Sequence, residues 1–253
     1  MSRRAVILAG GKGTRLRPYT VVLPKPLMPI GEYPILEVVV RQLVRDGFDH
    51  ITLAVNHQAD IIKSYFNSGR DWGARIDFSL EKEFLSTMGP LRLIDDLPEH
   101  FLVMNGDVLT DLDYAAFFER HVAEKGLFSI SSFVRRLRSE YGVLTVSGER
   151  RLAGFQEKPE VEYEVSMGIY MLSREVLRHI PEGRPFGFDD LMYAMLDRHL
   201  PVAVRRHEGR WLDIGRQEDY MEAIDTFEAD RHLFLGAHAE ADVPTTCERT
   251  GAS

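Results

Sequence analysis

The chain has 253 residues, of which 44% are hydrophobic, and this size and composition are typical of a single α/β domain with one buried core. Its formal net charge of −8 argues against a surface that binds nucleic acid or anionic membranes, and the lone Cys247 excludes an internal disulfide and a thiolate metal cluster. The first residues contain no signal-like apolar segment, and no apolar stretch approaches the ~20 residues of a membrane helix, so we expect a soluble cytoplasmic protein.

A glycine-rich loop follows the first predicted strand, residues 5–8. Glycines allow backbone N–H groups to approach a phosphate closely, and Arg15, Arg17 and Lys25 add positive charge nearby in the sequence. The loop matches neither G-x-G-x-x-G nor a P-loop, which ends in Lys-Ser or Lys-Thr. The pattern is typical of a cradle for a polyphosphate, and the alternative is a glycine turn with solvated charges. The cradle would consist of Leu8, Ala9, Gly10, Gly11, Gly13 and Thr14.

Strands and helices alternate over the next hundred residues. The apolar patterns predict helices at 34–44 and 59–66, and strands at 51–55, 75–80 and 101–104. This rhythm indicates a largely parallel sheet, in which ligands bind beyond the carboxyl ends of the strands. Two carboxylates follow strands at that edge. They are Glu81 and Asp107, and Asp107 ends the triplet Asn105-Gly106-Asp107.

The second half of the chain is less regular, and we expect part of it to form the acceptor-binding half of the same domain. A polar segment without hydrophobic period follows, so we assign the domain to residues 1–235 and a flexible tail to 236–253. The pattern predicts helices at 114–122, 174–179, 189–199 and 216–233, strands at 127–134, 166–172 and 202–206, and a hairpin formed by 142–146 and 152–156.

Six short motifs occur in an order that is specific to one family. They are L-A-G-G-x-G-T-R-L-x-P at 8–18, P-K-P-L at 24–27, N-G-D at 105–107, Y-G-V at 141–143, E-K-P at 157–159 and W-L-D-I-G at 211–215. With them the chain resembles the sugar-1-phosphate nucleotidyltransferases, or nucleotide-sugar pyrophosphorylases. The likeness is to a short form without C-terminal β-helix, such as the mannose-, heptose- and cyclitol-1-phosphate guanylyltransferases, and covers about residues 4–227.

The resemblance implies a Rossmann-like (GT-A-like) α/β fold, with a mixed, mainly parallel sheet flanked by helices in a single domain. It also implies the reaction of a nucleoside triphosphate with a sugar 1-phosphate, which gives a nucleoside diphosphate sugar and pyrophosphate. No protein nucleophile is needed, because the acceptor's own phosphate oxygen attacks the α-phosphorus. The site must instead align the reactants and neutralise several negative charges.

The resemblance also assigns the charged residues. Arg15 and Lys25 would bind the triphosphate and the attacked phosphorus. Asp107 and Asp213 would hold Mg²⁺, which prefers carboxylate oxygens, although an N-G-D triplet alone is more often a turn. Lys158 would bind the acceptor's phosphate and Glu157 its hydroxyls, and the alternative for this E-K-P motif is a solvated turn. The remaining contacts would be Glu81 and Gly89 to the nucleotide, and Asn105, Gly142 and Gly168 to the acceptor.

Glu81 bears on the choice of base, because by resemblance it stands where thymidylyl enzymes typically have Gln. A carboxylate can accept both the N1–H and the N2–H₂ of guanine, whereas thymine offers one donor, so GTP is favoured over dTTP, CTP, UTP and ATP. The alternatives are that Glu81 is a surface residue at a strand end, or that Glu83 has this role.

Two departures from the family pattern concern the acceptor. Met88 and Met167 stand in segments that read Gly-Thr-Ala-Gly and Asn-Ala-Gly in many hexose-1-phosphate enzymes. Thioethers in the pocket would favour a heptose, deoxy-sugar or cyclitol phosphate, and the alternative is that both methionines fill the core.

Two rival functions remain open, a metal-dependent GT-A glycosyltransferase and a non-catalytic sensor of nucleotide-sugars. A protein that only binds a nucleotide-sugar has no need for the full charge-neutralising set of Arg15, Lys25, Asp107 and Asp213, which argues against the sensor. His57, His121, His179 and His207 lack metal-ligand spacing and are interpreted as surface or structural residues. An exposed apolar face on the last predicted helix would allow a homodimer or a higher homo-oligomer.

Overall fold

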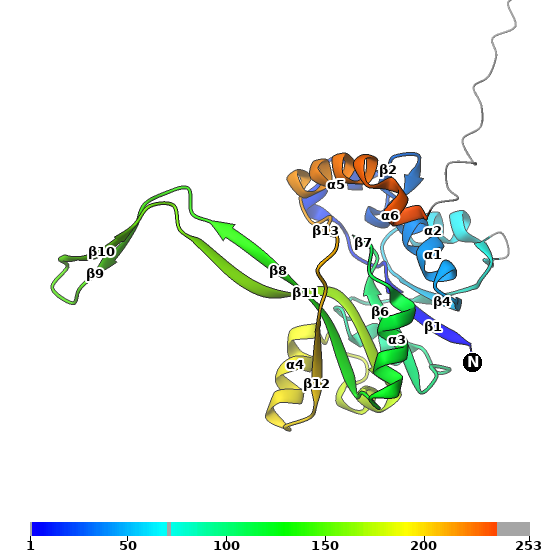
Figure 1. Ribbon diagram of the computed structural model, residues 1–253. Coiled ribbons are helices and arrows are strands. Elements are labelled where there is room, and N and C mark those ends of the chain that lie inside the picture. The colour runs from blue at the N-terminus through cyan, green and yellow to red at the C-terminus, as the bar shows by residue number, and fades with distance from the viewer. Residues whose placement is uncertain (1, 70–71, 237–253) are drawn as a thin grey trace, which may run out of the picture.

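A seven-stranded sheet forms the centre of the computed structural model, which describes residues 2–69 and 72–236 (Figure 1). The strand order is β12-β8-β11-β6-β1-β4-β5, and every strand except β11 runs in the same direction. This confirms the predicted mixed, mainly parallel sheet. The strands are β1 (Arg3–Leu8), β4 (Phe48–Val55), β5 (Arg75–Leu80), β6 (His100–Asn105), β8 (Phe128–Arg138), β11 (Glu160–Ser173) and β12 (Val202–Arg206).

Helices cover both faces of the sheet because its strands are apolar on both sides. In β1, Ala5 and Ile7 belong to one buried cluster and Val6 to another. The helices packed in the first cluster are α1 (Ile35–Arg45), α2 (Ala59–Phe66), α3 (Tyr114–Ala123), α5 (Gln217–Ala229) and α6 (Arg231–Leu235). The second cluster contains α4 (Phe188–Asp197) and the 3₁₀ helices η5 (Gly89–Leu93) and η6 (Arg174–His179). No helix within the described ranges is long and apolar enough to cross a membrane.

The helix predicted at 216–233 is interrupted in the structure. Helix α5 ends at Ala229, and Asp230, with φ −115° and ψ 24°, separates it from α6. The apolar period continues across this break, since Phe227 and Phe234 stack in the same buried cluster, which is why the sequence gives one continuous pattern. Apart from Gly236, the predicted tail at 236–253 lies outside the described residues.

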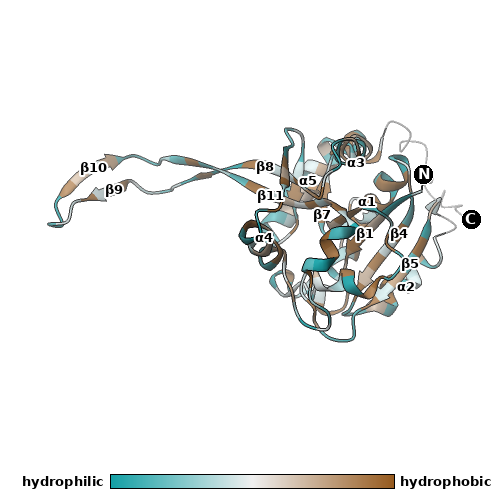
Figure 2. Ribbon diagram, turned by 90° about the horizontal axis from the view of Figure 1, so that it is seen from below, coloured by the Kyte–Doolittle hydropathy of each residue, from teal (hydrophilic) through white to brown (hydrophobic). Residues whose placement is uncertain are grey.

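The largest difference from the sequence prediction concerns β8 and β11. They were expected to span 127–134 and 166–172, but they pair as far as Arg138 and Glu160. The added residues are mostly polar, so they carry no apolar signal, yet main-chain pairing and an ion pair between Arg136 and Glu162 hold them together. Beyond them lies the hairpin of β9 (Val143–Val146) and β10 (Leu152–Gln156). We call residues 133–165 the arm, and it projects away from the body in both Figure 1 and Figure 2.

Candidate active site

The glycine loop leaves the carboxyl end of β1 and is folded back onto the segment that follows it. The Ala9 N–H donates to the Ala54 carbonyl over 2.8 Å, and the Thr20 hydroxyl donates to the Gly13 carbonyl over 2.7 Å. Gly13 has φ 59°, and a Cβ atom there would lie 2.9 Å from Cβ of Lys25. Only glycine fits this left-handed, crowded position. The fold of the loop therefore places Lys25 beside it.

Lys25 and Asp107 form an ion pair at this edge of the sheet. Lys25 begins the 3₁₀ helix η3 (Lys25–Leu27) and is buried, with 9% of its surface exposed. Asp107 follows β6 through Gly106, whose N–H donates to the Leu8 carbonyl over 3.0 Å. A Cβ atom on Gly106 would lie 3.2 Å from that same carbonyl oxygen. The N-G-D turn is thus packed directly against the start of the glycine loop.

Asp213 is brought next to Asp107 by a small antiparallel ribbon that the sequence did not predict. Strand β13 (Trp211–Asp213) pairs with β7 (Val108–Thr110), so that Asp213 lies opposite Val108, and the Ile214 N–H donates to the Asp107 carbonyl over 3.1 Å. Burial, and then the Asp107 carboxylate, raise the pKa of Asp213 above its usual range. Two neighbouring carboxylates that repel each other in this way fit a divalent cation, which would neutralise both.

Arg15 and Asp219 complete the charged cluster. A Cβ atom on Gly215 would lie 3.6 Å from carboxylate oxygens of both Asp213 and Asp219, and 3.7 Å from Nη1 of Arg15. Arg15 is exposed and lies in the 3₁₀ helix η1 (Thr14–Leu16), so its guanidinium is available to a ligand. Sequence reasoning missed Asp219, whose position in the first turn of α5 is typical of an ordinary solvated acid.

Glu81 lies at the same edge of the sheet, after β5, which β1 and β4 separate from β6. It follows β5, is buried, and accepts hydrogen bonds from the Leu85 N–H over 3.1 Å and from Asn56 over 3.3 Å. Burial raises the pKa of this carboxyl group. One of its oxygens would lie 3.6 Å from a Cβ on Gly10, so Glu81 adjoins the glycine loop, whereas its rival Glu83 is exposed.

The remaining residues that were predicted to contact the nucleotide or the acceptor do not all lie in one part of the structure. Gly89 packs between other segments, since a Cβ there would lie 2.9 Å from Leu85 Cβ. Gly168 has φ 76° and adjoins Asn105, whose amide nitrogen would lie 2.5 Å from a Cβ on Gly168. Met88 and Met167 are both buried in the core, which confirms the alternative that they fill it. The prediction that their thioethers shape the acceptor pocket is therefore wrong.

Gly142, Glu157 and Lys158 lie on the arm, where the β9–β10 hairpin begins and ends. All three are exposed, and Gly142 adjoins Glu157, because a Cβ on Gly142 would lie 3.2 Å from Oε2 of Glu157. Figure 1 shows the hairpin far from β7, which Asp107 directly precedes, and from β13, which ends at Asp213. Within one chain the structure does not bring these predicted acceptor residues together with the charged cluster.

An open cleft of about 580 Å³ lies beside the charged cluster, between the base of the arm, the end of β12 and α5. Phe133 and Trp211 form an apolar wall, with ring centroids 5.5 Å apart. Arg206 and His207, which the sequence analysis did not assign to the site, also line the cleft. Arg206 is the last residue of β12 and His207 follows it at the carboxyl edge of the sheet, so the edge rule that predicted Asp107 could have identified them. The cleft also includes Asp213 and Asp219.

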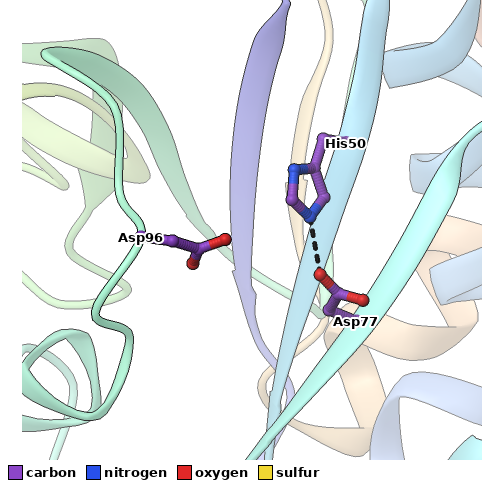
Figure 3. Close-up of side chains that lie close together, drawn as sticks. All are labelled: His50, Asp77 and Asp96. Atoms are coloured by element: carbon purple, nitrogen blue, oxygen red, sulfur yellow. Dashed lines mark hydrogen bonds and ion pairs between the residues drawn. The ribbon is translucent and has the colours of Figure 1, made fainter.

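A second group of possible metal ligands lies toward the amino-terminal ends of β4 and β5, away from this edge of the sheet. His50, Asp77 and Asp96 bring ligand atoms within 4.8 Å of one another. A hydrogen bond of 2.7 Å joins His50 to Asp77 and is drawn as a dashed line in Figure 3. The buried Arg4 guanidinium donates to the His50 ring over 2.9 Å and to both Asp96 oxygens. Its hydrogen bonds hold the pKa of Asp96 below the usual range. The donor atoms are therefore engaged in an ion-paired network.

The variant Arg4→Ala is expected to lower the free energy of unfolding by about 2 kcal/mol, because it leaves the buried Thr52 hydroxyl and the His50 ring without their donor. Arg75→Ala is the matched control. Arg75 also pairs with Asp77, but its side chain is 65% exposed, so a change within about 0.5 kcal/mol is expected. Urea titrations of both variants measure the difference, and equal effects would contradict the prediction.

The carboxyl edge of this mainly parallel α/β sheet carries a glycine loop, basic side chains and paired carboxylates, and together these features define one class of protein. It is the class of nucleotide-binding proteins suited to phosphate chemistry. The chain belongs to the nucleotidyl transferase family, which matches residues 4–230.

Two sequence relatives and one solved structure illustrate the likeness. The chain is 36% identical over 242 residues to the UTP–glucose-1-phosphate uridylyltransferase of Synechocystis sp., with 87% of this chain and 62% of the relative covered. It is 34% identical over 228 residues to mannose-1-phosphate guanyltransferase beta-B of Xenopus laevis, with 86% and 62% covered. The crystal structure of HddC from Yersinia pseudotuberculosis complexed with GMP-PN matches with a TM-score of 0.66 and 27% identity, over 89% of this chain and 99% of that chain. The chain thus spans about 62% of the length of these curated relatives.

Proposed function

We propose that the chain is a sugar-1-phosphate nucleotidyltransferase, with its catalytic domain in residues 1–235. The observation that carries this proposal is the meeting of Lys25, Arg15, Asp107 and Asp213 beside the glycine loop. Relatives that are named as nucleotidyltransferases of glucose 1-phosphate and mannose 1-phosphate support the same reaction. The substrates are a nucleoside triphosphate and a sugar 1-phosphate or a related small phosphate.

In the proposed reaction an oxygen of the acceptor's phosphate attacks the α-phosphorus of the triphosphate. A new P–O bond forms, and the bond to the bridging oxygen of the β-phosphate breaks, so that its electron pair leaves on pyrophosphate. Arg15 and Lys25 hold the negative phosphates, and the loop's backbone N–H groups orient them. Asp107 and Asp213 would hold Mg²⁺, which neutralises charge on the phosphates when bound.

The decisive experiment is a grid of triphosphates against sugar phosphates, read by pyrophosphate release. A metal-dependent glycosyltransferase would instead release a nucleoside diphosphate from a nucleotide-sugar, and a sensor would bind without turnover. Pyrophosphate formation that depends on both substrates supports the proposal. Its absence across the grid, with nucleotide-sugar binding retained, would favour the sensor.

Guanine is the base that we favour within this reaction. Glu81 adjoins the loop and has a carboxylate able to accept the two N–H donors of guanine. A relative named as a guanyltransferase and the GMP-PN complex of HddC agree with this choice, while the uridylyltransferase relative names the main competitor, UTP. Initial rates are therefore expected to be highest with GTP.

The variant Glu81→Gln is expected to lower kcat/KM for GTP by about 30-fold, because the amide loses one acceptor and turns a donor toward guanine, which costs about 2 kcal/mol. Rates with UTP should change less. Glu83→Gln is the control, since Glu83 is exposed two residues away and should leave the GTP rate within about twofold. Equal loss for all triphosphates in Glu81→Gln would contradict a role in base choice.

A further inference from the structure

The hairpin at the end of the arm presents an unpartnered apolar face. Leu144 pairs with Phe155 and Val146 with Leu152 across the two strands, so all four side chains lie on the same face. Their exposed fractions are 58%, 58%, 53% and 67%, respectively. A two-stranded hairpin with a bare apolar face is at best marginally stable in water, and such a patch marks an interaction site.

This apolar face cannot reach the body of its own chain. The pairing of β8 with β11 runs without interruption from Ser132 opposite Ser166 to Arg138 opposite Glu160. Past that point the Ser139 N–H donates to the Pro159 carbonyl over 3.0 Å, which continues the ribbon toward the hairpin. Folding the hairpin back onto its own cleft would break these bonds. Figures 1 and 2, which differ by a quarter turn, both show it extended.

The residues at the base of the hairpin indicate what the apolar face packs on. Glu157 and Lys158, which directly follow β10, are the predicted ligands of the acceptor, yet in one chain the hairpin stands apart from β13, which ends at Asp213. The cleft beside Asp213 is open and has an apolar wall of Phe133 and Trp211. An exposed apolar face and an open, partly apolar cleft on the same molecule complement each other when two copies meet about a two-fold axis.

We infer that two copies of this chain exchange arms, so that each hairpin packs over the partner's cleft and each Lys158 binds the acceptor phosphate held in the partner's site. The active site is then composite, with the glycine loop and aspartates from one copy and the acceptor contacts from the other. This inference rests on the proposed function for the role of Lys158, and on the exposed hairpin for the dimer itself.

A mixing experiment tests the shared site. Asp107→Asn has an intact arm, and Lys158→Ala has an intact core. As a homodimer, Lys158→Ala should lose about a hundredfold in turnover, since it removes a charged contact to the acceptor. The Asp107→Asn homodimer should lose more. After equimolar mixing and subunit exchange, half of the dimers are mixed and each has one intact site. The mixture should therefore recover about one quarter of the wild-type rate.

Two differently tagged variants show whether mixed dimers have formed. Recovered turnover in the co-purified mixed dimer supports the exchange. Mixed dimers without recovery overturn it, because each copy must then use its own arm. Mixing that yields no co-purified dimer at all overturns it too, since the arms would not link the copies.

The molecular mass in solution tests the interface without any activity. The wild type should be dimeric and Phe155→Asp monomeric, because an aspartate in the apolar face cannot be buried there. Leu196→Asp, on α4 and 65% exposed, is the matched control and should stay dimeric. A monomeric wild type, or a dimer that Phe155→Asp leaves intact, overturns the inference. A hairpin-dependent dimer in a wild type that releases no pyrophosphate would count against the proposed function alone.

Discussion

Replacing Asp107 by Asn is expected to lower kcat about a thousandfold, or about 4 kcal/mol, while the fold is retained. Asn has nearly the same shape but removes one of the two adjacent negative charges, and with it the pairing to Lys25 and the ligand that we propose for Mg²⁺. Pyrophosphate release at saturating substrates measures the loss. The pKa of Asp213 should fall in this variant, because the Asp107 carboxylate contributes to raising it.

Asp219→Asn is the control for this prediction. Asp219 also adjoins Asp213, but it lies on α5 and its nearest cation is Arg135 at 3.9 Å, so the variant should lose less than about tenfold. Removal of divalent cations by a chelator should abolish wild-type turnover, and added Mg²⁺ should restore it. An Asp107→Asn enzyme that keeps more than a tenth of wild-type turnover would contradict the metal role.

Much of the body of the fold could be predicted from residue periodicity. Buried strands such as residues 51–55 are almost entirely apolar. Helix α1 ends at Arg45, just before Gly47, whose positive φ of 83° stops the helix. The rule that ligands bind beyond the carboxyl ends of parallel strands placed Glu81 and Asp107 at one edge, where both lie in the structure. Periodicity and topology are therefore sufficient for residues that directly follow a core strand.

The position of Asp213 beside Asp107 follows from a different kind of contact. The β7–β13 ribbon has three residues in each strand and joins segments about a hundred residues apart, too short for any period to reveal. The motifs named both aspartates, but only the folded chain shows how they meet. The arm was missed for a related reason. Its outer strands, such as 135–138, are mostly polar and are held by main-chain pairing, which leaves no apolar signature.

Lys25→Met is expected to lower kcat by about a thousandfold as well, because it removes the ammonium group of a buried residue that pairs with Asp107. The double variant Lys25→Met/Asp107→Asn should lose little more than either single variant. The two side chains form one charged unit, and groups that act as a unit show strongly non-additive effects on kcat. Steady-state kinetics of the four proteins in this double-mutant cycle measure the coupling.

Lys12→Met separates this contact from a general effect of positive charge. Lys12 lies in the same glycine loop but is exposed, so its loss should cost less than about tenfold. If Lys12→Met were as inactive as Lys25→Met, the charge of the loop as a whole would explain the activity. If the double variant instead lost the product of the two single effects, about a millionfold, Lys25 and Asp107 would act independently. Non-additivity together with a mild Lys12 variant would place the catalytic contribution in the Lys25–Asp107 pair, because Lys25 packs beside Gly13 of the loop and pairs with Asp107 at the edge of the sheet.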